Sequence, residues 1–381
     1  AAALDLDTSS TPSILSATEK LAYDLMSWYH NNLTTTPADL VGTLPLMSWY
    51  WWEAGALWGG MIDHWAYTDD WSYTPDIQKA LLAQQGPDKD FMPPAYYGSM
   101  GNDDQAFWAF AALAAVEYGF PVPAGSPGTT WLDLADKVYT EQRGRWDTSS
   151  CGGGLKWQVF ESSKGWDYKN SVSNGAFFQI AARLGRFTNG GGDYLPWAEK
   201  TWDWMERVGL IDDEYNVFDG TNDLNDCSDV NHVAWSYNPA IVLYGAAMMW
   251  NQTGEDKWAT RTRGLVEACK RTFFSPFPNA TGVMFEFACE REGTCDNDQL
   301  SFKAYMARFM AKAAKIAPEL VLDEVRELLT ATARAVALAC TGPADGHMCG
   351  QKWYVGGYDG HGGIGEAMSA LESVQSLLLL D

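Results

Sequence analysis

The sequence is short of positive charge, of histidine and of long apolar runs. Its 381 residues include 26 lysines and arginines against 49 aspartates and glutamates, and the net charge of -23 argues against nucleic acid or anionic lipid as a partner. The five histidines are scattered and none is paired at metal-ligand spacing, so we expect no metal site and no cofactor. No apolar run is long enough to span a membrane.

Two glycine-rich stretches resemble nucleotide-binding motifs, but neither fits one. Residues 360–365 match G-x-G-x-x-G, yet they lie too close to the end of the chain for the βαβ unit that a dinucleotide site needs. The glycines after Cys151 lead into Leu155, Lys156 and Trp157 rather than Gly-Lys-Ser/Thr, which excludes a P-loop. No G-x-S-x-G elbow occurs, so the sequence lacks that form of nucleophilic serine site.

The seven cysteines contain no C-x-x-C motif and predict disulfides. Cys269 shares a helical stripe with Trp258 and Leu265, so we expect it to be the buried, unpaired thiol. The remaining six allow fifteen pairings. Proximity along the chain favours the pairs Cys289–Cys295, Cys340–Cys349 and, as the remainder, Cys151–Cys227.

Three Asn-x-Ser/Thr sequons accompany the cysteines, at Asn32, Asn251 and Asn279. Cysteines, sequons and acidic charge together indicate a secreted eukaryotic glycoprotein with disulfide bonds.

Aromatic residues are the most unusual abundance, with 19 tryptophans and 17 tyrosines. Flat aromatic faces pack against the C–H faces of sugar rings, and their N–H and O–H groups bond hydroxyls. The alternative interpretation is a tryptophan-rich core, and composition does not separate the two.

Helix-start signals recur at nearly even intervals and predict about twelve helices, or six hairpins. Residues 103–116 and 239–250 are apolar all round, which indicates buried inner helices, whereas residues 318–340 and 255–272 are apolar on one side, as outer helices are. Because the two kinds alternate, the sequence predicts an all-α fold, an (α/α)6 barrel with Gly- and aromatic-rich loops at the cleft. A helical solenoid is disfavoured because no fixed repeat period is visible. The predicted starts are Ser16, Trp49, Thr74, Asn102, Thr129, Ser171, Tyr194, Ser236, Glu255, Asp298, Pro318 and His361.

The chain shows no linker. We expect a flexible arm over residues 1–15, a single catalytic domain over residues 16–381, and short β pieces near residues 156–160 and 283–287.

Two adjacent carboxylates, Asp103 and Asp104, stand in the first turn of a helix that is apolar all round. Neighbouring helical side chains lie roughly 5 Å apart, and retaining glycosidases hold their two carboxyl groups about 5–5.5 Å apart. This spacing favours a nucleophile and a general acid/base at the floor of a cavity. The alternative is that the pair only caps the helix and complements its dipole.

The other inner-helix starts carry amides and aromatics, which suit a polyhydroxyl ligand. If all these starts share one opening, their side chains line one sugar site, although capping alone explains many of the Asn, Ser and Asp residues. The candidate substrate-binding residues are Trp51, Tyr97, Asn102, Asn170, Asn174, Trp235, Tyr237, Asn238, Gln299, Phe302 and Lys303.

The residues that carry these signals resemble glycoside hydrolase family 76, the α-1,6-mannanases. The stretch Gly101-Asn-Asp-Asp-Gln105 before an Ala/Trp/Phe-rich helix resembles the paired-aspartate motif of that family. The segments at 235–239, 301–303 and 169–174 resemble three further family segments. Pro239 and Ala240 depart from the Gln-Gly of the family, which weakens the match around Tyr237 and Asn238.

The resemblance implies an (α/α)6 barrel and a retaining mechanism, with Asp103 as nucleophile and Asp104 as general acid/base. Tyr237, Asn238, Asn174 and Phe302 would then help to line the sugar site.

The stretch from Trp49, the cysteines and the sequons resemble the fungal cell-wall branch of the family. That branch implies a monomeric transglycosylase, secreted or in the cell wall, with a GPI anchor on the precursor as its link to a membrane. It would cut the mannose core of a GPI glycan as donor and pass the anchored protein to a β-glucan acceptor. Three alternatives remain: a hydrolytic endo-α-1,6-mannanase, an inverting glycosidase, and a non-catalytic glycan-binding barrel.

Overall fold

The computed structural model describes residues 4–45, 49–126, 130–343 and 348–380. These residues contain twelve α-helices and five short strands. The chain forms two compact units. One is built from Ala1–Tyr29, Glu214–Asn216 and Ala234–Asp381, and the other from His30–Asp213 and Val217–Val233.

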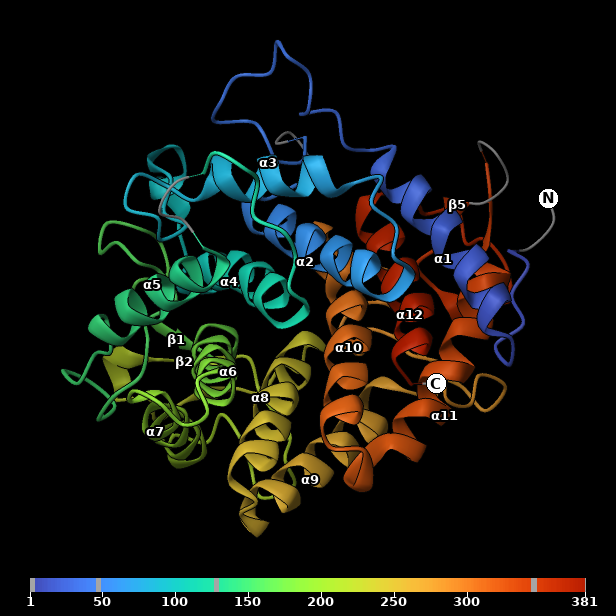
Figure 1. The fold of residues 1–381 in the computed structure, drawn as a ribbon. Coiled ribbons are helices and arrows are strands. Elements are labelled where there is room, and N and C mark those ends of the chain that lie inside the picture. Colours follow the sequence, from blue (N-terminus) through green and yellow to red (C-terminus); the bar gives the residue numbers. More distant parts are fainter. Residues whose placement is uncertain (1–3, 46–48, 127–129, 344–347, 381) are drawn as a thin grey trace. The chain divides into compact units, whose positions relative to one another are not determined.

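The second unit contains six of the helices and a small antiparallel sheet. Helix α4 packs against α2, α5 and α6, and α6 packs against α7 (Figure 1). Its helices are α2 (Trp51–Thr68), α3 (Thr74–Gln84), α4 (Asn102–Tyr118), α5 (Trp131–Gly144), α6 (Ser171–Phe187) and α7 (Tyr194–Arg207), with 3-10 turns η1 (Pro94–Ser99) and η2 (Asp223–Asn225). The sheet has the order β1 (Tyr168–Asn170), β2 (Gly220–Asn222) and β3 (Val230–Asn231).

The first unit contains the other six helices. Helix α10 packs against α8, α11 and α12, and α1 packs against α12; α10 and α12 run side by side in orange and red in Figure 1. Its elements are α1 (Thr11–Met26), α8 (Tyr237–Thr253), α9 (Asp256–Phe273), α10 (Asn297–Ile316), α11 (Pro318–Ala339), α12 (Ile364–Leu380), the hairpin β4 (Cys340–Gly342) with β5 (Met348–Cys349), and η3 (Trp353–Val355).

The even-numbered helices are buried on every face along most of their length, as the sequence predicts for inner helices. All residues of α4 from Gln105 to Ala115 are buried. Gly55 of α2 allows close approach to α4, because a Cβ there would lie 2.8 Å from the Trp108 ring. The odd-numbered α11 buries Val321, Val325 and Val336 on one side, so it is one-sided as predicted.

The twelve predicted helices are all present, and the differences lie at their ends. Helix α1 begins at Thr11, before the predicted Ser16, because the Ser10 hydroxyl accepts a hydrogen bond from the Ser13 N–H and Pro12 fits the first turn. The structure also differs from the predicted loose arm. Leu4 is buried, and its N–H donates to the Ala337 carbonyl at 3.2 Å.

The predicted β pieces are reduced to single bridges. Gln158 pairs with Gly101, and Met284 pairs with Phe274. The five strands lie elsewhere in the chain, and β4 begins at Cys340, the last residue of the predicted helix 318–340.

The cysteine predictions are confirmed. The disulfides are Cys151–Cys227, Cys289–Cys295 and Cys340–Cys349, and Cys269 is a buried free thiol. Among the described residues, no helix is both long and apolar enough to cross a membrane.

Removing the Cys151–Cys227 disulfide should destabilise the protein more than removing Cys289–Cys295. The sequence separations are 76 and 6 residues, and loop-closure entropy gives about 4 and about 2 kcal/mol respectively. Guanidinium unfolding of the two double Cys→Ala variants measures the difference. An equal or larger loss for the short loop would contradict this ranking.

Candidate active site

Asp103 and Asp104 occupy the first turn of α4, directly after Gly101. One Asp104 carboxylate oxygen accepts the Gly101 N–H at 2.7 Å, and Asp103 Oδ1 accepts the Ser173 hydroxyl at 3.2 Å. A Cβ on Gly101 would collide with Asp103 Oδ1 and lie 3.2 Å from Asp104 Oδ2. The missing side chain at residue 101 therefore lets both carboxyl groups gather at one point, and both remain partly exposed.

The capping alternative is real for Asp104, because its carboxylate accepts the N–H of Gly101, the N-cap residue of α4. Backbone N–H groups of residues 103 and 104 also bond the Asp103 carboxyl, but Asp103 has further partners outside its own helix. Its side chain bonds the Ser173 hydroxyl, and a side-chain hydrogen bond from Trp157 also reaches it.

An extended segment, residues 155–159, holds the starts of α4 and α6. The Asn102 N–H donates to the Trp157 carbonyl at 2.8 Å, and the Asn102 amide donates to the Lys156 carbonyl at 2.8 Å. From α6, Asn174 binds both backbone groups of Leu155, at 2.8 and 3.0 Å. The two helix starts are thus tied to one segment, and Trp157 of that segment reaches Asp103.

Burial raises the pKa of Asp103 to about 7, although hydrogen bonds from Ser173 and Trp157 act in the opposite direction. The neutral form of Asp103 is therefore favoured in mildly acidic solution. The resemblance implies the opposite resting state, with the proton on Asp104. In the unliganded protein at mildly acidic pH, burial therefore favours a proton on Asp103.

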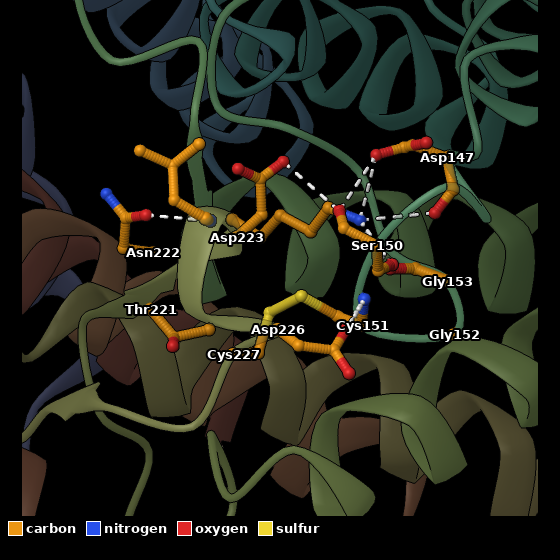
Figure 2. The surroundings of a disulfide bond; sticks show 12 residues. Asp147, Ser150, Cys151, Gly152, Gly153, Thr221, Asn222, Asp223, Asp226 and Cys227 are labelled. Carbon is orange, nitrogen blue, oxygen red and sulfur yellow. Dashed lines mark hydrogen bonds and ion pairs between the residues drawn. A yellow bond between two sulfur atoms is a disulfide. The ribbon is translucent and has the colours of Figure 1, made fainter.

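A buried ion cluster that includes Asp147 and Asp223 lies beside the Cys151–Cys227 disulfide (Figure 2). Lys169 is fully buried, and its ammonium donates to the carbonyls of Asp147, Ser150 and Gly153 at 2.8–3.1 Å. Lys156 pairs with Asp223, close to the Cys151–Cys227 disulfide. Lys169 precedes Asn170, whose side chain caps α6 by accepting the Ser173 N–H at 3.2 Å.

A cavity of about 460 Å³ lies beside this disulfide. Its lining includes Cys151, Arg207 and Asp226, and the guanidinium of Arg207 already donates to the Cys151 carbonyl at 3.2 Å.

The other predicted residues of this unit are held by protein partners. Trp51 is buried between Tyr96 and Trp108, and its indole N–H donates to Gln84 at 2.9 Å. The side-chain amides of Asn102, Asn170 and Asn174 form hydrogen bonds with backbone groups. The Asn102 amide oxygen also accepts a hydrogen bond from the Arg145 guanidinium at 2.9 Å. Tyr97 is half-buried, and its ring centroid lies 5.0 Å from that of Phe160.

In the other unit, Tyr237 and Phe302 form a stacked aromatic pair. Their ring centroids are 3.9 Å apart with an 8° interplanar angle, and Trp235 meets Phe302 edge-on at 5.9 Å. We call Trp235, Tyr237 and Phe302 the aromatic platform. Next to it, Asn238 is buried, and neither polar atom of its side chain has a hydrogen-bond partner among the described residues.

Gln299 and Lys303, also predicted to bind sugar, have partners in the same unit. Gln299 accepts the Asp296 N–H at 2.7 Å at the start of α10. The buried Lys303 pairs with Glu290 at 2.9 Å. A direct role of these two residues in binding sugar stays a prediction, as does the sharing of one opening by all the inner-helix starts.

Sequence reasoning missed Ser173, Trp157 and the buried Glu286 and Glu290. Ser173 lies inside a segment that the resemblance singled out, so the segment was found without the residue. Glu286 and Glu290 carry no sequence signal, because isolated glutamates are usually solvated. Within the described part of the chain, no cluster of three or more His, Cys, Asp or Glu side chains could hold a metal ion.

The raised pKa of Asp103 makes stability depend on pH. Between about pH 4 and 7 the folded protein keeps a proton that the unfolded chain has lost, so the free energy of unfolding falls as the pH rises. Asp103→Asn should reduce this fall, and Asp213→Asn at an exposed site is the control. Urea unfolding at pH 4.5, near the lower end of this window, and at pH 7.5, above its upper end, measures the fall. Equal slopes for wild type and Asp103→Asn would contradict the raised pKa.

The family comparisons agree with the motif. The sequence model of Glycosyl hydrolase family 76 matches residues 13–381. Mannan endo-1,6-alpha-mannosidase DCW1 of Saccharomyces cerevisiae is 41% identical over 382 residues, which cover 100% of this chain and 82% of that protein. The Candida albicans protein of the same name is 41% identical over 383 residues, covering 99% and 82%.

Solved structures show the same fold. Dfg5 of Chaetomium thermophilum, in complex with glucosamine, matches with a TM-score of 0.91 and 39% identity over 98% of this chain and 92% of that one. An inactive α-1,6-mannanase of Salegentibacter sp., with two adjacent aspartates changed to asparagine and α-1,6-mannotriose bound, matches with a TM-score of 0.75 and 19% identity over 97% and 100%. The predicted all-α, (α/α)6 barrel class is confirmed by these matches. The chain belongs to glycosyl hydrolase family 76 and is an enzyme of the glycoside hydrolase type.

Proposed function

We propose that this protein is a retaining glycosidase that acts on α-1,6-linked mannosides through Asp103 and Asp104. The observation that carries the proposal is the pair of adjacent, partly exposed carboxyl groups gathered at Gly101, of which Asp103 has a pKa raised by burial. Two comparisons support it. Close relatives are named mannan endo-1,6-alpha-mannosidases, and the Salegentibacter variant without its adjacent aspartates is inactive.

In the proposed mechanism Asp103 attacks the anomeric carbon and forms a glycosyl-enzyme, while Asp104 protonates the leaving oxygen. Burial places the resting proton on Asp103, so this proton passes to Asp104 before the attack. Ser173 and Trp157 favour that transfer, because hydrogen bonds to Asp103 stabilise its carboxylate. In the second step Asp104 takes the proton of an incoming hydroxyl, and that hydroxyl oxygen displaces Asp103 from the anomeric carbon.

We also propose that the aromatic platform and Asn238 bind mannose units. Trp235 and Tyr237 are half-buried, and we propose that the exposed part of each residue packs against a sugar face. The buried amide of Asn238 lacks a protein partner among the described residues, so a sugar hydroxyl would satisfy it.

A more specific proposal names the donor glycan and the acceptor glycan of the reaction. We propose that the donor is the mannose core of a GPI glycan and the acceptor is β-glucan of a fungal wall, with the protein acting as a monomer that is secreted or held in the wall. Fungal relatives with mannosidase names support this, as do the three disulfides, which are typical of extracellular proteins.

The two aspartates should respond differently to the leaving group. Asp104→Asn should lose about 10²–10⁴-fold in kcat/KM on α-1,6-mannobiose. It should lose far less on a dinitrophenyl α-mannoside, whose leaving group needs no protonation. Asp103→Asn should be inactive on both substrates.

Asp133→Asn is the matched control for these variants. Asp133 closes the capping box of α5, where it accepts the Thr130 N–H, as Asp104 does at α4, and it lies outside the proposed site. Normal turnover by Asp103→Asn would reject the assignment of the nucleophile.

Transfer and hydrolysis can be separated with a labelled α-1,6-mannoside donor and a β-glucan oligosaccharide acceptor. The transglycosylase proposal expects a joined, labelled product whose first-formed anomer is α by proton NMR. Free mannose products alone would favour an endo-mannanase, an inverted anomer would exclude the covalent intermediate, and binding without cleavage would favour a glycan-binding barrel.

A further inference from the structure

We propose that Glu286, with Glu290 beside it, is a positioning residue that fixes the aromatic platform for sugar binding. Both residues lie in the loop between α9 and α10. The inference rests on the proposed function, because it takes the aromatic platform to be a sugar-binding surface.

Glu286 holds the residue that stands between two members of the platform. Its carboxyl oxygens bind Ser236 twice: Oε1 accepts the Ser236 N–H at 3.0 Å, and Oε2 meets the Ser236 hydroxyl at 2.5 Å. Ser236 directly follows Trp235 and precedes Tyr237. Its hydroxyl does not cap α8, as a serine at that position usually would. One carboxyl group thus fixes the backbone from which both aromatic side chains project.

Glu290 holds the third member through its neighbour in α10. Its Oε2 accepts the Glu286 N–H at 3.0 Å and pairs with the Lys303 ammonium at 2.9 Å. Lys303 follows Phe302, donates to the Gln351 carbonyl at 2.5 Å and lies 3.6 Å from the centre of the Trp353 ring. Both sides of the stacked pair, Tyr237 and Phe302, are therefore anchored to one short turn.

The turn itself is closed by local links. The Glu290 N–H donates to the Glu286 carbonyl at 3.0 Å, and the Cys289–Cys295 disulfide follows at once. Because the turn is anchored at both ends, it can transmit a fixed geometry to the platform.

Burying this cluster is expensive for stability. Glu286 and Glu290 are fully buried and Lys303 is 1% exposed, whereas apolar side chains of similar volume would fill the space at lower cost. Burial raises the pKa of Glu286 to about 8, and the nearby Glu290 adds to the rise, while Ser236 and Lys303 oppose it.

Two further acids interact electrostatically with this cluster. Asp359 interacts with Glu290, and Glu366 interacts with Lys303. Glu286 is therefore neutral at acidic pH, where glutamine is its close mimic.

The test compares Glu286→Ala and Glu286→Gln, with Glu292→Ala at an exposed position of the same loop as control. Kinetics and tryptophan-fluorescence titration with α-1,6-mannotriose give KM, kcat and affinity. We expect Glu286→Ala to raise KM about tenfold while kcat changes less than about threefold, as loss of uniform binding requires. Glu286→Gln should restore KM below pH 7, because its amide can bond both Ser236 groups.

The pH dependence gives a readout that a merely structural role would not move. As the pH rises through about 8, wild-type Glu286 ionises and its repulsion with the neighbouring Glu290 increases, which should loosen the turn and lower the affinity for mannotriose. The Glu286→Gln protein should show no such fall.

The outcomes separate this inference from the proposed function. An active wild type with unchanged KM in folded Glu286→Ala would overturn the inference alone. Equal losses in Glu286→Ala and Glu286→Gln would also overturn it, since a lost fold and not a lost position would then explain them. If the wild-type protein binds mannotriose without cleaving it, the proposed catalysis is wrong, and the positioning role is still tested by the affinity measurements. If the wild-type protein neither binds nor cleaves mannotriose, both the proposed function and this inference are wrong.

Discussion

The burial of whole helices is the constraint on which the functional parts of each unit depend. Helices α4, α6 and α8 are buried along most of their length, and the candidate site residues lie at their starts. The first turn of α4 holds the two aspartates, and the first turn of α8 holds Tyr237 and Asn238. Each turn is tied to a neighbouring segment by buried hydrogen bonds, because a polar group without a partner there would be costly.

The first turns of α4 and α8 are held by hydrogen bonds from different kinds of side chain. Around Asp103, asparagine amides of α4 and α6 bind the backbone of residues 155–157, so neutral groups hold the frame. Around Ser236, two buried carboxyls and a lysine do so. The amide-to-backbone bonds of the first arrangement do not titrate, whereas the second arrangement changes when Glu286 ionises.

Much of the fold could be predicted because its signals are periodic. A helix such as α4 is apolar on every face and α11 on one, and that contrast alone separates inner from outer elements. Chain ends and sheets were harder, since the start of α1 is set by Ser10 and the packing of Leu4 by distant Ala337. In the candidate site, Asp103 and Asp104 could be predicted because they are neighbours in the sequence at the start of an apolar helix. Ser173 and Trp157 bond Asp103, and Glu286 bonds Ser236, from distant positions in the chain. Short sequence motifs do not predict such long-range contacts.

The Cys151–Cys227 link has a consequence for biosynthesis. It joins the loop whose carbonyls bind Lys169 to the hairpin that holds Asp223, so it braces the segment leading to Asn170 and Ser173. During translation this bridge cannot close until residue 227 has emerged into an oxidising compartment. Helices α4 to α7 have then already been synthesised, so the disulfide can brace the segment that leads to Asn170 and Ser173 only after those helices are made.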